Sequence, residues 1–430
     1  MTLTDELAWL DRHINLEAVA GRVEGLSLER MRRLVEVLGD PQLTYPVIHV
    51  TGTNGKGSTA RMITALLVES GLTVGTYTSP HLERINDRIS RDGEPIADDE
   101  LAQLLADLEH VEPHVGVTNS YFELLTAAGL RWFSDLAVDV AVVEVGLLGR
   151  YDATNVCDGL VAVVTNVGYD HTDGTGDWRA RIAEEKSGIV KPDSTLVLGE
   201  TAPELLPVFH RAGARETWER ERDFDCESNE LAVGGRLLEL RTPSASYDEV
   251  FLSLHGAHQG DNAACALAAV EAFFAAPLAD DIVRDALGRV TMPGRFEIVG
   301  RDPLVVLDGA HNAEGASTAA ATLHDDFHRE GETILVVGML SPRDPNAMLD
   351  ALDARDAAFV VASKAPSPRS LPPEEIAAAA EAMGVRAIVE PDVRRAIGRA
   401  RQLANPSDAI LVTGSLWFIG AARAALASGQ

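Results

Sequence analysis

Residues 52–58 read Gly-Thr-Asn-Gly-Lys-Gly-Ser and follow a short apolar run at 47–50, an arrangement typical of a phosphate-binding loop. The three glycines let the backbone turn tightly and approach an anion closely. Lys56 supplies a point charge, and Ser58 or Thr59 supplies a hydroxyl for Mg²⁺. The spacing departs from the standard G-x-x-x-x-G-K-[ST] motif, and the alternative is a glycine-rich turn without a ligand. The order of strand, loop, lysine, hydroxyl and helical pattern favours nucleotide binding.

Two further groups that could do chemistry follow apolar runs. Glu144 closes the run 138–145, and a carboxylate at a strand end beside a phosphate loop is where nucleotide enzymes hold Mg²⁺. His171 lies beyond the run 160–167, where open sheets place ligands, and with Asp170 it could ligate a metal. The alternatives are a solvated acid at a strand end and a surface histidine.

Lys186 lies in the sequence Glu184-Glu185-Lys186-Ser187 near the end of a helical pattern. It could pair with the neighbouring acids, or it could be a buried lysine that is catalytic or chemically modified. The sequence leaves both readings open.

Polar residues also gather around position 295. Arg295 lies in the segment Thr291-Met292-Pro293-Gly294-Arg295, which breaks the periodic pattern and predicts a hinge. Asp308 and His311 follow the next apolar run. If two units face each other across Arg295, their strand ends would enclose a cleft, which is the usual place for a ligand.

The elements that must position these groups alternate between strand and helix patterns. This alternation predicts an α/β fold with a mostly parallel, doubly wound sheet in the N-terminal part. Segment 215–255 has short alternating runs and predicts a small antiparallel appendage. The expected strands are 47–50, 73–77, 138–145, 160–167 and 195–198, and the expected helices are 99–108, 121–134, 179–187 and 261–274.

Alternation restarts after the hinge and predicts a second, Rossmann-like α/β unit. We therefore expect an ATP-binding domain at 1–290, a hinge at 291–297 and a C-terminal domain at 298–430. The expected strands there are 304–307, 333–337, 358–362, 387–389 and 409–413, and the expected helices are 314–323, 346–352, 373–382 and 393–403.

Composition limits the class of partner. The formal net charge of −29 disfavours binding to nucleic acid or to an anionic membrane. Only four lysines occur among 37 basic residues, which together with the acidic charge favours a halophilic source, with an ordinary acidic protein as the alternative. Three cysteines without C-x-x-C spacing and an acidic N-terminus without a signal-peptide pattern favour a cytoplasmic protein.

The chain resembles the folylpolyglutamate synthase/dihydrofolate synthase family, within the Mur-type ATP-dependent ligases. The resemblance extends from residue 25 to residue 416, and it depends on an ordered set of modest motifs. Their order along the chain makes the set specific. The motifs are Gly52–Ser58, Ser79-Pro80-His81-Leu82, Phe122-Glu123, Asp152–Val156, Asp170-His171, Glu185–Ile189, Pro293-Gly294-Arg295 and Asp308–Asn312.

The resemblance implies an ATP-dependent amide ligase. In such an enzyme a substrate carboxylate attacks the γ-phosphate of ATP and becomes an acyl phosphate, and the amine of L-glutamate then displaces phosphate. The implied carboxylate substrate is dihydropteroate or a reduced folate bearing glutamate. The implied cofactors are ATP and Mg²⁺, and we expect a monomer.

The resemblance also assigns roles to individual residues. The catalytic group would be Lys56, His171 and Lys186, with Lys186 matching a lysine that is carbamylated in the family. Ser58, Ser79, Glu144 and His171 would hold two metal ions. Pro80, His81 and Phe122 would line a pterin pocket. ATP would contact Gly52, Thr53, Asn54, Gly55, Lys56, Gly57, Ser58, Asn262, Arg295, Asp308 and His311.

Three positions depart from the family pattern. Leu148 replaces a common glycine in the loop after Glu144, and Tyr151 stands in the same loop. Arg343 stands where lysine is common. None of these changes touches the phosphate chemistry, but they leave the substrate preference open.

Three rival functions are weaker. One is a Mur-type ligase for another carboxylate, which the Ser79-Pro80-His81-Leu82 stretch disfavours. Another is a nucleotide-dependent switch, but the Asn-Lys-x-Asp motif of GTPases is absent from the sequence. The third is a non-catalytic relative, which the intact set of candidate residues disfavours.

Overall fold

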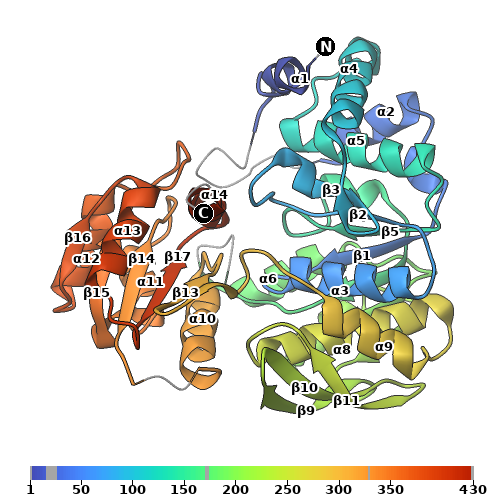
Figure 1. Cartoon of the computed structure of the whole chain (residues 1–430). Coiled ribbons are helices and arrows are strands. Elements are labelled where there is room, and N and C mark those ends of the chain that lie inside the picture. The colour runs from blue at the N-terminus through green and yellow to red at the C-terminus, as the bar shows by residue number, and fades with distance from the viewer. Residues whose placement is uncertain (1, 16–26, 170–173, 328–329, 428–430) are drawn as a thin grey trace.

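The structure is a computed structural model that describes residues 2–15, 27–169, 174–327 and 330–427. It has an N-terminal body and a C-terminal body, shown on the right and left of Figure 1, with the chain crossing between them once, near residue 295. No helix within the described ranges is long and apolar enough to cross a membrane.

An eight-stranded sheet forms the centre of the N-terminal body, in the order β4-β3-β2-β5-β1-β6-β7-β8. From β2 onward in this order, each strand is parallel to its neighbour. At the other edge, β3 pairs antiparallel with β2, and β4 pairs antiparallel with β3. Its central strands are buried along their length, as expected where helices cover both faces. The strands are β1 Val47–Thr51, β2 Val74–Tyr77, β3 Ile89–Arg91, β4 Glu94–Pro95, β5 Val140–Glu144, β6 Gly159–Val164, β7 Thr195–Leu198 and β8 Glu216–Glu219.

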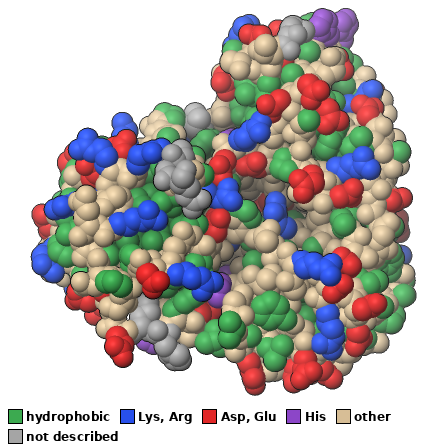
Figure 2. Space-filling model, viewed as in Figure 1, with side chains coloured by type: hydrophobic (Ala, Val, Ile, Leu, Met, Phe, Trp, Pro, Cys, Tyr) green, Lys and Arg blue, Asp and Glu red, His purple; other side chains and the backbone are tan. Residues whose placement is uncertain are grey.

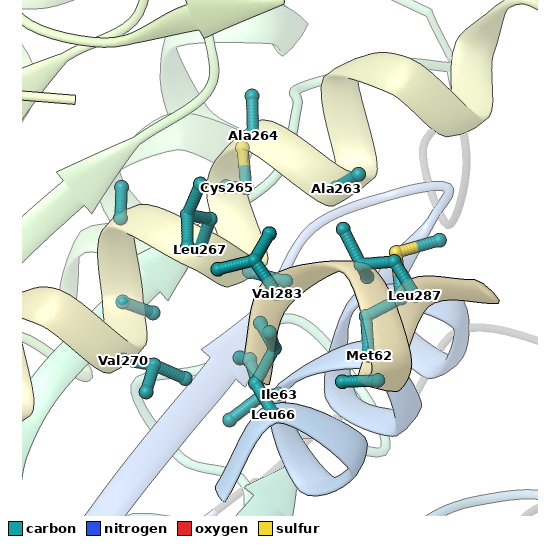
Figure 3. Close-up of a cluster of buried hydrophobic side chains, with 14 of the residues drawn as sticks. Met62, Ile63, Leu66, Ala263, Ala264, Cys265, Leu267, Val270, Val283 and Leu287 are labelled. Carbon is teal, nitrogen blue, oxygen red and sulfur yellow. The ribbon is translucent and has the colours of Figure 1, made fainter. Parts of the chain in front are cut away.

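Helices cover both faces of this sheet. On one face α3 (Lys56–Glu69), α8 (His258–Phe274) and α9 (Asp280–Arg289) form one core with the strands. Figure 3 shows aliphatic side chains of α3 directed at those of α8 and α9. Several alanines of α8 lie in this core, and such small side chains allow the helices to approach closely. The other face carries α1 Leu3–Leu10, α2 Glu29–Val37, α4 Asp98–Val115, α5 Tyr121–Asp135, α6 Trp178–Ser187 and α7 Leu206–His210.

The small antiparallel sheet consists of β9 (Asp225–Ala232), β10 (Gly235–Arg241) and β11 (Ser246–Leu252) in the order β11-β10-β9. Its apolar side chains pack into the core of α8 and α9. The appendage predicted for 215–255 is therefore confirmed except at its start. There β8 pairs in parallel with β7 and extends the large sheet, because its short pattern does not show which sheet it will join.

The C-terminal body has a six-stranded sheet in the order β12-β13-β17-β14-β15-β16, parallel except for β12. Its strands are β12 Glu297–Arg301, β13 Leu304–Leu307, β14 Thr333–Val337, β15 Ala357–Ala362, β16 Ala387–Val389 and β17 Ala409–Thr413. One face packs against α10 Ala313–Asp325, α11 Pro345–Ala351 and α12 Pro373–Ala382, and the other against α13 Val393–Leu403 and α14 Leu416–Ala427.

A buried ion pair fixes the C-terminal end of α10 to the N-terminal body. Arg236 of β10 donates from Nη1 to Asp326 Oδ1 at 2.7 Å, and the Gly256 amide donates to Asp326 Oδ2 at 2.8 Å. The two charged side chains are 9% and 1% exposed. Burial alone would raise the pKa of Asp326, but His255, the Gly256 amide and Arg236 together lower it.

We expect Asp326→Ala to destabilise the protein by about 3–5 kcal/mol, because the buried Arg236 would lose its only partner of opposite charge among the described residues. Thermal and urea denaturation monitored by circular dichroism would measure this. The exposed neighbour Asp325 gives the matched control, since Asp325→Ala removes the same charge from a solvated side chain. Equal effects of the two substitutions would contradict the interpretation.

Candidate active site between the two bodies

The phosphate loop joins β1 to α3 in the predicted order. Gly55 precedes the first turn of α3 with φ +82°, a conformation that favours glycine. A Cβ atom there would lie 3.1 Å from Asn262 Cγ and closer still to its Oδ1. Glycine at position 55 is therefore required both by the backbone and by the approach of α8.

Two residues after β6 hold this loop in place. Asn166 Oδ1 accepts the amides of Thr53 at 3.1 Å and Asn54 at 2.9 Å, and Thr165 Oγ1 donates to the Asn54 carbonyl at 2.7 Å. Neither residue was predicted from the sequence to have a role. Their signal was a polar pair directly after a buried strand, next to the strand that carries the loop.

Lys56 and Ser58 occupy the first turn of α3, on the cavity wall. Lys56 Nζ donates to the Thr53 carbonyl at 3.1 Å, so the ammonium lies over the loop itself. Ser58 is buried. The end of the helix thus presents a cation and a hydroxyl to the same space, as phosphate binding requires.

Glu144 ends β5 opposite this turn and is 4% exposed. Burial raises the pKa of its carboxyl, against the opposing influence of Lys56, the Ser79 amide and Arg295. The Ser79 amide donates to Glu144 Oε2 at 3.2 Å, which brings the loop after β2 to the same point. Glu144, Ser58 and Ser79 line the same cavity, and their carboxylate and hydroxyl oxygens are donors of the kind that Mg²⁺ prefers.

In the described part of the chain, no group of three or more His, Cys, Asp or Glu side chains is placed to bind an ion.

The opposite wall comes from the crossing segment and the C-terminal body. Asp308 follows β13 and accepts the amides of Phe296 at 2.9 Å and Ala310 at 2.9 Å. Burial raises the pKa of Asp308, and the neighbouring Arg295 acts against that rise. His311 Nδ1 lies 3.0 Å from the Gly309 carbonyl.

The two walls enclose a cavity of about 530 Å³. In Figure 2 the same region is a hollow between the two lobes, with basic side chains near its rim. The cavity brings together most of the predicted site. Its lining includes the predicted residues Thr53, Asn54, Gly55, Lys56, Gly57, Ser58, Ser79, Pro80, Glu144, Asn262, Arg295, Asp308 and His311.

Other predicted residues lie around this cavity rather than on its wall. Gly52 is buried at the end of β1. Phe122 packs against Gly146, where a Cβ atom would lie 2.9 Å from Phe122 Cε2 and closer still to its Cζ. His81 contacts Trp417 of the C-terminal body edge to face at 5.0 Å and accepts a hydrogen bond from Arg88. His171 lies outside the described residues.

Lys186 is 3% exposed in α6, below the loop that follows Glu144. The loop and helix are closely packed, since a Cβ atom on Gly149 would lie 2.7 Å from the Glu185 carbonyl and 3.2 Å from Lys186 Cα. Leu148 in this loop has φ +60°, so the leucine adopts the left-handed conformation that a glycine would favour.

Comparison with known proteins gives a consistent result. Residues 50–270 match the Mur ligase middle domain family, and residues 294–416 match the Mur ligase, glutamate ligase domain family. The dihydrofolate synthase/folylpolyglutamate synthase of Mycobacterium tuberculosis is 39% identical, over 92% of this chain and 89% of its own length.

Solved structures are similar over almost the whole chain. The Mycobacterium tuberculosis folylpolyglutamate synthase complexed with ADP and AMPPCP has a TM-score of 0.91 at 38% identity, covering 99% of this chain and 98% of its own. A bifunctional folylpolyglutamate synthase/dihydrofolate synthase with Mn, AMPPNP and L-glutamate bound has a TM-score of 0.87 at 30% identity, with the same coverage.

Proposed function

The chain belongs to the folylpolyglutamate synthase/dihydrofolate synthase family, and we propose how its interdomain cavity forms an amide bond. It is an ATP-dependent glutamate ligase with dihydrofolate synthase/folylpolyglutamate synthase activity. One observation supports the mechanism above all. A single cavity has Lys56, Ser58 and Glu144 on one wall and Arg295 and Asp308 on the other.

ATP binds across this cavity. Lys56 and the loop amides hold the β- and γ-phosphates, and Arg295 approaches them from the other wall. Asn262, Asp308 and His311 contact the rest of the nucleotide. Closing the two walls around the phosphates aligns the reacting groups, which is the main source of catalysis in phosphoryl transfer.

Mg²⁺ fits the oxygen donors of Ser58 and Glu144, and Ser79 and His171 are assigned to a second ion. Bound Mg²⁺ neutralises charge on the phosphate oxygens. The buried carboxylate of Glu144 is suited to this role because its charge needs compensation.

The reaction has two steps. An oxygen of the pteroate or folate carboxylate attacks the γ-phosphorus, and the bond to the β-phosphate oxygen breaks to release ADP. The amine of L-glutamate then attacks the acyl carbon, phosphate leaves, and the amine loses a proton. Pro80, His81 and Phe122 are assigned to the acceptor side, and the bodies 1–290 and 298–430 act as two domains joined at 291–297.

The net charge of the chain supports a proposal about the surroundings in which the enzyme works. The charge of −29 with only four lysines supports a monomer in a salt-rich cytoplasm, where screening reduces repulsion between carboxylates. Figure 2 shows acidic side chains spread over both lobes.

We expect phosphate release from ATP only when L-glutamate and a pteroate or folate carboxylate are both present, since the acyl phosphate forms and decays within one closed site. Turnover with dihydropteroate and with tetrahydrofolate, measured side by side, would show which acceptors are used. Omitting each component in turn gives the controls. Phosphate release that is insensitive to both substrates would contradict the ligase function.

A further inference from the structure

Glu314 reaches out of the C-terminal body to the phosphate loop. It lies in the first turn of α10, and its Oε2 accepts a hydrogen bond from Asn54 Nδ2 at 3.2 Å. Its other oxygen, Oε1, accepts the Tyr169 amide at 2.9 Å. One carboxylate of the C-terminal body thus bridges two loops of the N-terminal body, at the cavity between the two bodies.

The hydrogen-bond directions at this contact determine which side chain fits. Asn312 Oδ1 accepts the Gly315 amide at 2.8 Å, so its Nδ2 donates to Asn54 Oδ1 at 3.1 Å. Asn54 must then present its own Nδ2 to residue 314, while the Tyr169 amide presents a second donor. A carboxylate accepts both, whereas a glutamine amide has only one acceptor oxygen.

Gly168 leaves room for this carboxylate. A Cβ atom there would lie 2.7 Å from Glu314 Cδ and 2.9 Å from Oε1, and closer still to Oε2. Gly168 is not among the residues with positive φ, so its backbone conformation does not require glycine. The steric reason for glycine at this position is therefore the approach of Glu314.

Asn54 transmits the contact to the phosphates. Its main chain is already fixed on the other side by Thr165 and Asn166, so only its side chain is available to the C-terminal body. A contact that forms when the bodies approach would therefore lock the loop in the geometry that holds the γ-phosphate.

We propose that Glu314 is a positioning residue that couples approach of the C-terminal body to the geometry of the phosphate loop, through Asn54 and the Gly168–Tyr169 backbone. The proposal rests on the proposed function, because it concerns the rate of phosphoryl transfer. Glu314 itself does not touch the reacting atoms in this account. Nucleotide affinity should therefore change little when it is removed, and kcat should fall.

The kinetic test compares Glu314→Ala, Glu314→Gln and Gly168→Ala with the exposed-charge control Asp325→Asn. We expect kcat to fall about 10-fold in the first three, with the Kd of ADP and the Tm nearly unchanged, because small misplacements near a reacting centre have large effects. The fall in kcat expected for Glu314→Gln is informative because the glutamine side chain keeps the shape of glutamate and changes only its hydrogen bonding. Retention of wild-type kcat by Glu314→Gln would overturn the hydrogen-bond argument.

A double variant tests the steric argument. Gly168→Ala should have little further effect in a Glu314→Ala background, because the clash is then absent. An equal loss in both backgrounds would overturn the proposal, as would a fall in ADP affinity that matches the fall in kcat.

Hydrogen exchange gives a test that does not depend on turnover. The Tyr169 amide should exchange about 10-fold faster in Glu314→Ala than in the wild-type protein with ADP, because its acceptor is lost. Unchanged exchange would overturn the proposal. The exchange test and the turnover test can fail separately. If the Tyr169 amide loses protection in Glu314→Ala but the wild-type protein shows no glutamate-dependent turnover, the contact is supported and only the proposed function is contradicted.

Discussion

Lys56→Ala is expected to reduce ligase turnover by about 100-fold or more, because it removes the cation at the start of α3 that lines the cavity where we propose that the transferred phosphate binds. Its neighbours in the cavity cannot replace it. Glu144 carries a negative charge when ionised, and Arg295 approaches from the other wall. Steady-state phosphate release with saturating L-glutamate and acceptor would measure the loss.

Lys364→Ala is the matched control for this variant, since Lys364 is an exposed lysine in the loop after β15. It should retain turnover within about 2-fold, as surface substitutions usually do. Calorimetry with ADP should also show weaker binding in Lys56→Ala. Full activity of Lys56→Ala would show that the loop is not the ATP site.

Lys186→Ala is expected to lower turnover by a similar factor of about 100, and short carboxylic acids should restore part of it. The family resemblance assigns a carbamate to this lysine, formed when the neutral amine adds to CO₂ and loses a proton. Lys186 is almost completely buried below the loop after Glu144, where a lost side chain leaves space for a small carboxylate. Acetate or propionate in that space would replace the missing charge.

Restoration of activity by carboxylic acids distinguishes a carbamate on Lys186 from a purely structural role of this lysine. Lys191→Ala serves as the control, because Lys191 is partly exposed and donates to the Asn155 carbonyl at 3.3 Å. Carboxylic acids should not raise the activity of Lys191→Ala. The carbamate role fails if Lys186→Ala has normal activity, or if acids raise both variants equally.

The elements that carry the site could be predicted because their signals are local. The strand bounds 304–307, 333–337, 387–389 and 409–413 are confirmed residue for residue. Buried parallel strands appear in the sequence as runs of β-branched residues, and helices appear as apolar residues with a 3.6-residue period. Both patterns can therefore be recognised within a single segment. Strand β8 was assigned to the wrong sheet, because its four residues, of which only Glu219 is buried, do not show which sheet they join.

The order of strand, glycine-rich loop and helix could also be predicted. The structure shows what surrounds Gly57, the glycine that departs from the standard motif. A Cβ atom on Gly57 would lie 3.6 Å from Glu144 Oε2 and 3.3 Å from the Met292 methyl group. The third glycine thus lies where the loop, the acidic strand end and the crossing segment meet.

The sequence by itself determined the order of strand, loop, lysine and acid, because each depends on neighbours within a few residues. Tertiary structure alone decided which residues meet across the cavity. Glu314 reaches Asn54 across 260 residues of chain, and Lys186 lies below a loop that begins about 40 residues earlier. Such contacts depend on how two separately folded bodies pack together, and no local pattern records that packing.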